Sequence, residues 1–312
     1  MLRDLRRADG PAYLEMLERG FPEESVLLGN RREEFEKIFR RVFRWDTRIL
    51  LFILGAFGRP MVRALVVEAD GRAVATTLVT FPTGAAYVSN VVVDPAYRRR
   101  GYARQMLAEA LTTARRAKRK YVVLDVLESN TGARALYDSL GYLPLQSRAH
   151  LLHNATGRFA QATEPNPSIR PMRRSDASAL VEISRRQTPP EVEKVIPTRK
   201  HHFVMSGIIS HMLGSEDAAW VLDRGHGPEA HVAAAVSRAS EAGHLTAPTL
   251  SESVDDRLAV DLVATAVAWC AARGVPRILT MVSDHNPRGR AALEAVGFHD
   301  ARPLWTLYRN VD

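Results

Sequence analysis

The chain has 312 residues, a length that favours two domains over a single core. Its 46% hydrophobic and 25% charged residues exclude an intrinsically disordered chain, and its longest apolar run is far shorter than the ~20 residues of a membrane span. The net charge of +8 lies entirely in residues 1–155, while the single cysteine, Cys270, excludes an internal disulfide framework and, without a signal-peptide pattern, predicts a cytoplasmic protein.

Apolar periodicity predicts the elements of the first half. A short strand at 2–6 leads into a helix for which Asp9 is a candidate N-cap, and a second helix covers Arg31–Trp45. The Asp70-Gly71 pair between two β-branched runs predicts a hairpin. The remaining predicted elements are strands Val62–Ala69, Ala73–Phe81 and Tyr87–Val93, helix Tyr102–Ala117, strand Tyr121–Leu127, helix Thr131–Leu140 and a strand near 143–153.

The segment 91–103 carries the strongest chemical signal. It reads Val-Val-Val-Asp-Pro-Ala-Tyr-Arg-Arg-Arg-Gly-Tyr-Ala, an apolar strand that runs into a loop rich in Arg and Gly and then into a helix. Such a loop directs backbone N–H groups and a helix N-terminus at one point, which favours an anion. Nine basic residues and one acid between Arg98 and Lys120 add to this tendency. The spacing fits neither a Walker loop nor a dinucleotide-binding fingerprint.

The second half repeats the first. Arg3, Arg6, Arg7 and Asp9 recur 167 residues later, and Asn130, Arg134, Ala135 and Gly141 recur 156 residues later as Asn286, Arg290, Ala291 and Gly297. Ser175-Asp176 is the corresponding N-cap candidate. The predicted elements are strands 168–172, Trp220–Asp223, Ala230–Ala239 and His244–Leu250, helix Arg257–Arg273, strand Arg277–Val282, helix Arg288–Val296 and strand Leu304–Tyr308.

These patterns predict a tandem duplication of a mixed α/β fold, in which a central sheet is flanked by helices. We expect a first domain at 1–155, a linker at 156–167 with two prolines, and a second domain at 168–312.

The loop resembles the acetyl-CoA loop of the GNAT superfamily of N-acetyltransferases, Gln/Arg-x-x-Gly-x-Gly/Ala after a strand that ends in Val-x-Pro. Downstream, Asn130-x-x-Ala133-x-x-Leu136-Tyr137-x-x-x-Gly141-Tyr142 resembles the second motif of the family. Both motifs stand in the usual order and separation, and the resemblance covers nearly all of residues 1–155. The tandem arrangement is similar to that of the mycothiol synthase family, except that the intact motifs here stand in the first copy.

The resemblance implies tandem GNAT folds and a set of acetyl-CoA contacts in the first copy. Tyr137 would stand near the thioester sulfur, where its phenol can protonate the leaving thiolate. Asn130, with Ala133 on the same helix, would contact the pantetheine arm. The pantetheine would pair with the strand Val91, Val92 and Val93, and the pyrophosphate would bind the loop formed by Arg98, Arg99, Arg100, Gly101, Tyr102, Ala103 and Arg104.

The base that deprotonates the acceptor is left open. The strand Tyr87–Val91 has no carboxylate, so Ser89 and Asn90 are candidates for ordering a water, and Glu128 is a further candidate. A structural role for each remains the alternative. The region Gly20–Trp45 is expected to select the acceptor, although its spaced Glu and Arg residues also fit an exposed helix with pairs such as Arg32/Glu36.

The second copy has lost the residues of the loop. Arg98–Ala103 aligns with Val254–Ala259, so that the glycine is absent and Asp255 and Asp256 replace two arginines; Tyr137 aligns with Leu293. We expect this copy not to bind acetyl-CoA productively, and Asn286 to serve as a helix N-cap before Pro287.

The predicted function is therefore an acetyl-CoA-dependent N-acetyltransferase. It would act by direct attack of a primary amine in a ternary complex, with Tyr137 as the general acid, acetyl-CoA as co-substrate and no metal. The acceptor would be a small-molecule or peptide amine, and we expect a monomer or homodimer without nucleic-acid or membrane partners. The alternatives are a non-catalytic acyl-CoA-binding regulatory protein and a nucleic-acid binder that uses the basic residues.

Overall fold

The computed structural model describes residues 1–21, 32–42, 62–155, 166–203, 214–237 and 240–312. Most of the predicted linker at 156–167 and much of the predicted acceptor region Gly20–Trp45 lie outside these residues. The described chain divides into two compact units, one made of residues in 1–145 and 305–312, the other of residues in 146–304.

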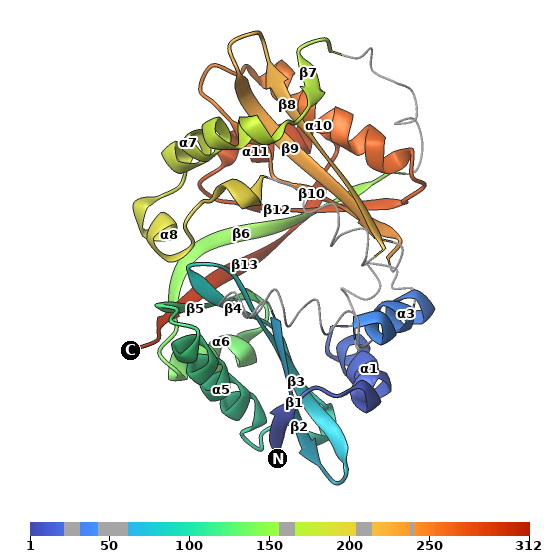
Figure 1. Cartoon of the computed structure of the whole chain (residues 1–312), viewed down its shortest axis with the longest axis vertical. Helices are drawn as coiled ribbons and strands as arrows, with labels where there is room; N and C mark the ends of the chain where they lie inside the picture. Colours follow the sequence, from blue (N-terminus) through green and yellow to red (C-terminus); the bar gives the residue numbers. More distant parts are fainter. Residues whose placement is uncertain (22–31, 43–61, 156–165, 204–213, 238–239) are drawn as a thin grey trace. The chain divides into compact units, whose positions relative to one another are not determined.

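The first unit has helices on both faces of its strands. Figure 1 shows α5 and α6 on one face and α1 on the other. Its elements are β1 (Leu2–Asp4), α1 (Gly10–Gly20), α3 (Arg32–Val42), β2 (Val62–Ala69), β3 (Arg72–Thr83), β4 (Ala85–Val93), α5 (Tyr102–Arg116), β5 (Tyr121–Leu127) and α6 (Thr131–Ser139). Strands β1 to β4 pair antiparallel in sequence order, and β5 pairs parallel with β4. The predicted Asp70-Gly71 turn is confirmed, since both residues have positive φ.

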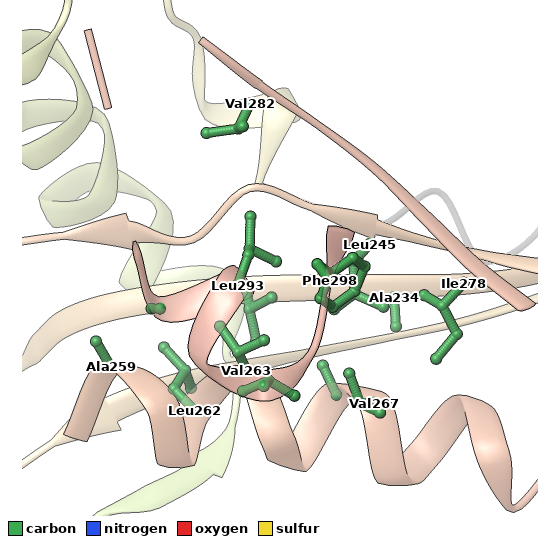
Figure 2. Close-up of a cluster of buried hydrophobic side chains, with 14 of the residues drawn as sticks. Ala234, Leu245, Ala259, Leu262, Val263, Val267, Ile278, Val282, Leu293 and Phe298 are labelled. Atoms are coloured by element: carbon green, nitrogen blue, oxygen red, sulfur yellow. The ribbon is translucent and has the colours of Figure 1, made fainter. Parts of the chain in front are cut away.

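The second unit repeats this order. Its elements are β7 (Ile169–Pro171), α7 (Ala177–Gln187), α8 (Pro190–Val195), β8 (Ser215–Asp223), β9 (Pro228–Ser237), β10 (Ala242–Thr246), β11 (Thr249–Leu250), α10 (Asp256–Ala271), β12 (Arg277–Ser283) and α11 (Pro287–Val296). Strands β7 to β10 are antiparallel neighbours, and β10 runs parallel to β12. Its core packs α10 and α11 against the sheet, with Leu262, Val263 and Leu293 fully buried (Figure 2).

The last strand of each half crosses to the other unit. Strand β6 (Leu143–Asn154) pairs antiparallel with β12, from Arg148↔Ser283 to Asn154↔Arg277. Strand β13 (His299–Asn310) ends beside β5 in the first unit. The units therefore change at 145/146 and 304/305, whereas the sequence predicted one boundary at 156–167. Sequence periodicity finds such strands but does not specify their partners.

The duplication is repeated in the hydrogen bonds. Arg3 binds both carboxylate oxygens of Asp9 at 2.6 and 2.8 Å, and Arg170 binds those of Asp176 at 2.8 and 3.0 Å. Asp9 and Asp176 both stand at the predicted N-cap positions, but neither caps the following helix through its side chain. Each carboxylate instead accepts a hydrogen bond from the backbone N–H of the residue three positions earlier. Arg6 donates to Asp9 and Arg173 donates to Asp176, both at 2.7 Å.

Candidate functional site

A β-bulge bends the end of β4 away from β5. Leu78 pairs with Ser89 and Thr76 with Val92, so that Asn90 and Val91 oppose a single residue of β3, and Asn90 has φ +54°. The parallel pairing of β4 with β5 ends at Val88↔Leu124. Beyond that pair the described residues of β4 and β5 form no further ladder pairs, which leaves an opening in the strand pairing where an extended ligand can bind to the edge of β4.

The loop after β4 presents backbone N–H groups at the start of α5. Arg99 and Gly101 have φ of +62° and +81°, and a Cβ built on Gly101 would meet no atom within 4 Å. Throughout the described chain, no acceptor is found for the N–H groups of residues 99–104. Unpaired N–H groups and the positive end of a helix dipole together form an anion site.

Two arginines of this loop donate hydrogen bonds to backbone carbonyls that precede them in the chain. Arg98 Nε donates to the Val93 carbonyl at 3.2 Å, and Arg100 donates to the Ala96 carbonyl at 3.4 Å. Arg100 also lies over the Tyr97 ring at 4.9 Å, while the Tyr97 hydroxyl donates to Asp70 at 2.7 Å. The positive charges therefore remain exposed at the loop without folding across it.

Helix α6 begins at the same opening. The Asn130 side-chain oxygen accepts the Ala133 N–H at 3.1 Å, which caps the helix. In the described structure the amide nitrogen of Asn130 makes no hydrogen bond, so it is available to a ligand. Two residues later, Gly132 has no atom within 4 Å of a Cβ position, and the start of the helix is open.

Tyr137 of α6 belongs to the same buried cluster as Val88 and Leu124, the last paired residues of β4 and β5. The residue is 6% exposed, and burial raises the pKa of its phenol to about 12. Its ring packs 5.8 Å from that of Tyr142. No hydrogen-bond partner of the Tyr137 hydroxyl occurs among the described residues, and this oxygen remains in contact with solvent, whereas the Tyr142 hydroxyl is buried and unpaired. Tyr137 therefore keeps its proton across the neutral range and can donate it.

The three candidates for assisting deprotonation lie in different surroundings. Ser89 and Asn90 lie at the bulge of β4, and the Asn90 side chain interacts with the Tyr13 hydroxyl of α1. Glu128 is exposed in the turn after β5, where its carbonyl accepts from Arg134 at 3.4 Å. The predicted ion pair of Arg32 with Glu36 on α3 is present at 3.4 Å, although the rest of the acceptor region lies largely outside the described residues.

A carboxylate at the opening was missed by the sequence analysis. Asp125 of β5 accepts a hydrogen bond from the Tyr87 hydroxyl through Oδ2, and one from Thr306 through Oδ1 at 2.7 Å. The available signal was one acid inside the apolar strand Tyr121–Leu127. Thr306 gave no signal, because it belongs to the last strand of the other half.

In the second unit the corresponding opening is filled by the chain itself. Asn286 caps α11 through Gly289 at 3.0 Å, as predicted, and its amide nitrogen donates to the Pro248 carbonyl at 2.9 Å. Arg288 stands where the first copy has Gly132, and it donates to the carbonyls of Ser251, at 3.1 Å, and Val254.

The helix start in the second unit is occupied as well. The Asp255 side chain accepts the Leu258 N–H at 2.9 Å and so caps α10. The corresponding helix of the first unit, α5, has Gly101 as its N-cap, with no side-chain cap. An incoming anion would therefore meet a carboxylate in the second unit and free N–H groups in the first.

Part of the chain is similar in sequence to a known family, and the whole chain is similar in fold to known structures. Residues 24–142 match the model of the acetyltransferase (GNAT) family. No curated protein sequence matches the chain. A tandem GNAT protein from the clavulanic acid biosynthesis pathway has a similar structure, with 14% identity, a TM-score of 0.69, and coverage of 100% of this chain and 98% of its own. A GCN5-related N-acetyltransferase from Sphaerobacter thermophilus has 17% identity, a TM-score of 0.65, and coverage of 100% and 95%.

Two features are absent from the described residues. No helix among them is long and apolar enough to cross a membrane. No cluster of three His, Cys, Asp or Glu side chains suited to a metal ion occurs there.

Proposed function

We propose that this chain, which belongs to the GNAT superfamily and has two such folds in tandem, transfers the acetyl group of acetyl-CoA to a primary amine in its first unit. The proposal is supported by three features of the first unit. These are an unpaired strand edge after Val88, a loop of free N–H groups at Arg99–Arg104, and the neutral phenol of Tyr137.

The residues present fit acetyl-CoA in chemistry and order. The loop N–H groups and the exposed arginines Arg98 to Arg100 suit the pyrophosphate, since a helix start favours doubly charged anions. The backbone of Val91 to Val93 offers a strand edge to the amides of the pantetheine arm, and the amide nitrogen of Asn130, which makes no hydrogen bond among the described residues, is a further donor for this arm. The thioester would then stand near Tyr137.

The proposed reaction is a direct attack. The neutral amine nitrogen bonds to the thioester carbon, the carbon–sulfur bond breaks, and the thiolate takes the proton of the Tyr137 hydroxyl, while the nitrogen loses one proton to become the amide. A thiol has a reference pKa near 8.5, below that of the phenol, and the proton lost by the nitrogen restores the phenol, whose charged form is disfavoured by burial. General acid assistance of this kind contributes about 100-fold or more to a rate.

We also propose that the second unit does not bind acetyl-CoA. Asn286 and Arg288 donate to backbone carbonyls at the position where a ligand would bind. Leu293 stands where the first copy has Tyr137. Breaking the two Arg288 hydrogen bonds to admit a ligand would cost about 1.5–3 kcal/mol each, since their donor is charged.

The test is release of free thiol from acetyl-CoA by the full chain with a panel of primary amines: spermidine, tyramine, glucosamine and a lysine peptide. We expect wild type to turn over at least one, Tyr137→Phe to lose about 100-fold in kcat, and Tyr142→Phe, the matched neighbour, to keep its rate. Binding of acetyl-CoA without turnover of any amine would favour the alternative, a non-catalytic acyl-CoA-binding protein.

A further inference from the structure

Strand β8 of the second unit has an unpaired edge beyond the end of β7. The short strand β7 is the last strand of the sheet and pairs with β8 only at Trp220–Leu222 (Figure 1). The final bond between the two segments runs from the Met172 N–H to the Ala219 carbonyl at 2.9 Å. From Ser215 to Ala218, no described residue pairs with this edge of β8.

The backbone of Asp217 points out of the sheet at this edge. The Asp223 N–H and the Ala219 carbonyl both bond to the residues that flank β7, so the odd-numbered residues of β8 direct their N–H and C=O groups to that side. The Ala233 N–H, opposite Ala219 in β9, bonds away from β8, to the Thr246 hydroxyl at 2.9 Å. Asp217 therefore offers one N–H and one C=O to an added strand.

A cavity of about 480 Å³ lies against this edge. On the face that packs on α10, it is lined by Trp220 and Trp269, whose rings meet edge to face with centroids 5.9 Å apart. On the face that packs on α7, it is lined by Met172 and Phe203. Side chains of an extended peptide alternate between the two faces of a sheet, so a strand added here would meet an apolar surface on both.

In the first unit the corresponding space is filled by an arginine. The registers of β1 with β2 and of β7 with β8 make Arg63 the counterpart of Ala218. The Arg63 guanidinium donates to Asp4 at 2.8 Å. It also donates to Glu109 and Thr113 of α5, both at 2.6 Å. An alanine at this position of the second unit leaves the space between strand and helix open.

The second unit has also lost partners that hold this arginine. At the repeat offset of 167 residues, Pro171 stands in place of Asp4. At the offset of 156, which aligns the buried residues of α5 and α10, Trp269 stands in place of Thr113. Neither a proline ring nor an indole accepts a hydrogen bond from a guanidinium. The cavity therefore presents an apolar surface where the first unit binds a cation.

Two arginines give the cavity a positive end. Arg173 and Arg174 follow the residue that makes the last bond to β8, so they line the cavity at the Ala219 end of the unpaired edge. Both are exposed, and neither side chain forms a salt bridge within the described chain. The lining carries one carboxylate, Asp217, farther along the same edge. This arrangement favours a ligand with acidic groups at the arginine end and no acidic group opposite Asp217.

We propose that the unpaired edge of β8 binds an extended peptide segment by strand addition. The peptide backbone bonds to the backbone of Asp217, and an aromatic or large apolar side chain packs against the two indoles. Acidic side chains of the peptide bind Arg173 and Arg174. This recognition site is independent of the acetyl transfer proposed above.

The experiment titrates a short blocked peptide into the full chain by calorimetry. The peptide has two glutamates at one end, a central phenylalanine and a lysine at the other end. It is made in both chain directions, because a strand edge accepts parallel and antiparallel partners. We expect one site per chain for at least one direction. Replacing the glutamates by glutamines should weaken binding about tenfold, and added salt should weaken the binding of the original peptide.

The first unit indicates which variant should block the site. Ala218→Arg introduces the residue that fills this space in the first copy, so it should weaken peptide binding at least about tenfold. The matched control Ala291→Arg changes an exposed alanine of α11 in the same unit and should bind the peptide like wild type. Arg174→Glu reverses the charge of an exposed side chain and should weaken binding about tenfold.

Equal peptide affinity of Ala218→Arg and Ala291→Arg would overturn the inference. If circular dichroism shows that Ala218→Arg does not fold, Arg174→Glu decides, and wild-type affinity of that variant would contradict the site. A wild type that binds neither peptide overturns it as well, as does equally tight binding of phenylacetate, which would assign the cavity to a small aromatic acid. Acetyl-CoA is titrated into the same samples, so a failure of peptide binding is distinguished from a failure of the proposed function.

Discussion

Asn130 and Asn286 cap corresponding helices in the same way and use their amide nitrogens differently. The side-chain oxygens accept N–H groups at 3.1 and 3.0 Å, from Ala133 and Gly289. The Asn286 nitrogen donates to the Pro248 carbonyl at 2.9 Å, whereas the Asn130 nitrogen makes no bond within the described chain. The amide nitrogen of Asn286 is thus bonded within its own unit, whereas that of Asn130 is available to a ligand. This is the difference we expect between a closed and an open ligand site.

Gly101→Val should abolish acetyl-CoA binding. Gly101 has φ +81°, where a β-branched residue is strained, and its side chain would cover the loop N–H groups. The matched control is Gly274→Val in the second unit, at φ +73° and likewise with no atom within 4 Å of its Cβ position. Calorimetry should show binding by the control alone, and equal affinity of the two variants would contradict the assignment of the loop.

Ionisation of Tyr137 should cause no loss of activity as the pH is raised to about 10. Burial raises the pKa of its phenol to about 12, so the donor form persists well above the value of about 10 for an exposed tyrosine. The measurement is kcat against pH at saturating amine. A fall in kcat centred near pH 8 that disappears in Tyr137→Phe would show that the phenol titrates far below our assignment.

Arg288→Ala should destabilise the second unit without creating a second acetyl-CoA site. The arginine satisfies two carbonyls, and its loss should lower the free energy of unfolding by about 3 kcal/mol. The control Arg290→Ala, on the same helix, loses only an exposed ion pair with Glu294 at 2.8 Å and should change stability by less than about 0.5 kcal/mol. Urea denaturation compares the two, and equal midpoints would contradict this role of Arg288.

Asp9→Asn should cost stability at neutral pH and not in acid. The pKa of Asp9 is lowered, chiefly by its hydrogen bonds with Arg3, so the ionised pair stabilises the fold above the ordinary value of about 3.9. This stabilisation is lost as the pH falls through the lowered pKa. At pH 7 we expect a loss of about 3 kcal/mol, against less than about 1 kcal/mol for Asp4→Asn, whose carboxylate is exposed. A difference between wild type and Asp9→Asn that persists unchanged to pH 2 would contradict the pairing.

The sequence predicted most of the helices and strands, but fewer of the pairings between strands. Strands Val62–Ala69 and Tyr121–Leu127 have the predicted bounds, because each is an apolar β-branched run between clear turn signals. The exchange of β6 and β13 was not predicted, since both copies have a strand there and its pairing depends on contacts distant in sequence. The bulge at Asn90 was also missed, because alternation does not reveal one extra residue.

The predicted site was recognisable where a motif fixes the local backbone. The positive φ angles of Arg99 and Gly101 and the helix cap at Asn130 are determined by neighbouring residues, so the sequence motif was sufficient to predict them. Asp125 gave only a weak signal, and its partner Thr306 lies 181 positions away in the chain. A side chain positioned by an exchanged strand is visible only after folding.

The most direct test is a calorimetric titration of acetyl-CoA into the full chain, read for stoichiometry. One site per chain, retained in Arg288→Ala and absent in Gly101→Val, is the result we predict for an open first unit and a closed second. Two sites per chain would show that Asn286 and Arg288 do not close the second opening. No binding would contradict the proposed acetyl-CoA site at the Arg99–Arg104 loop.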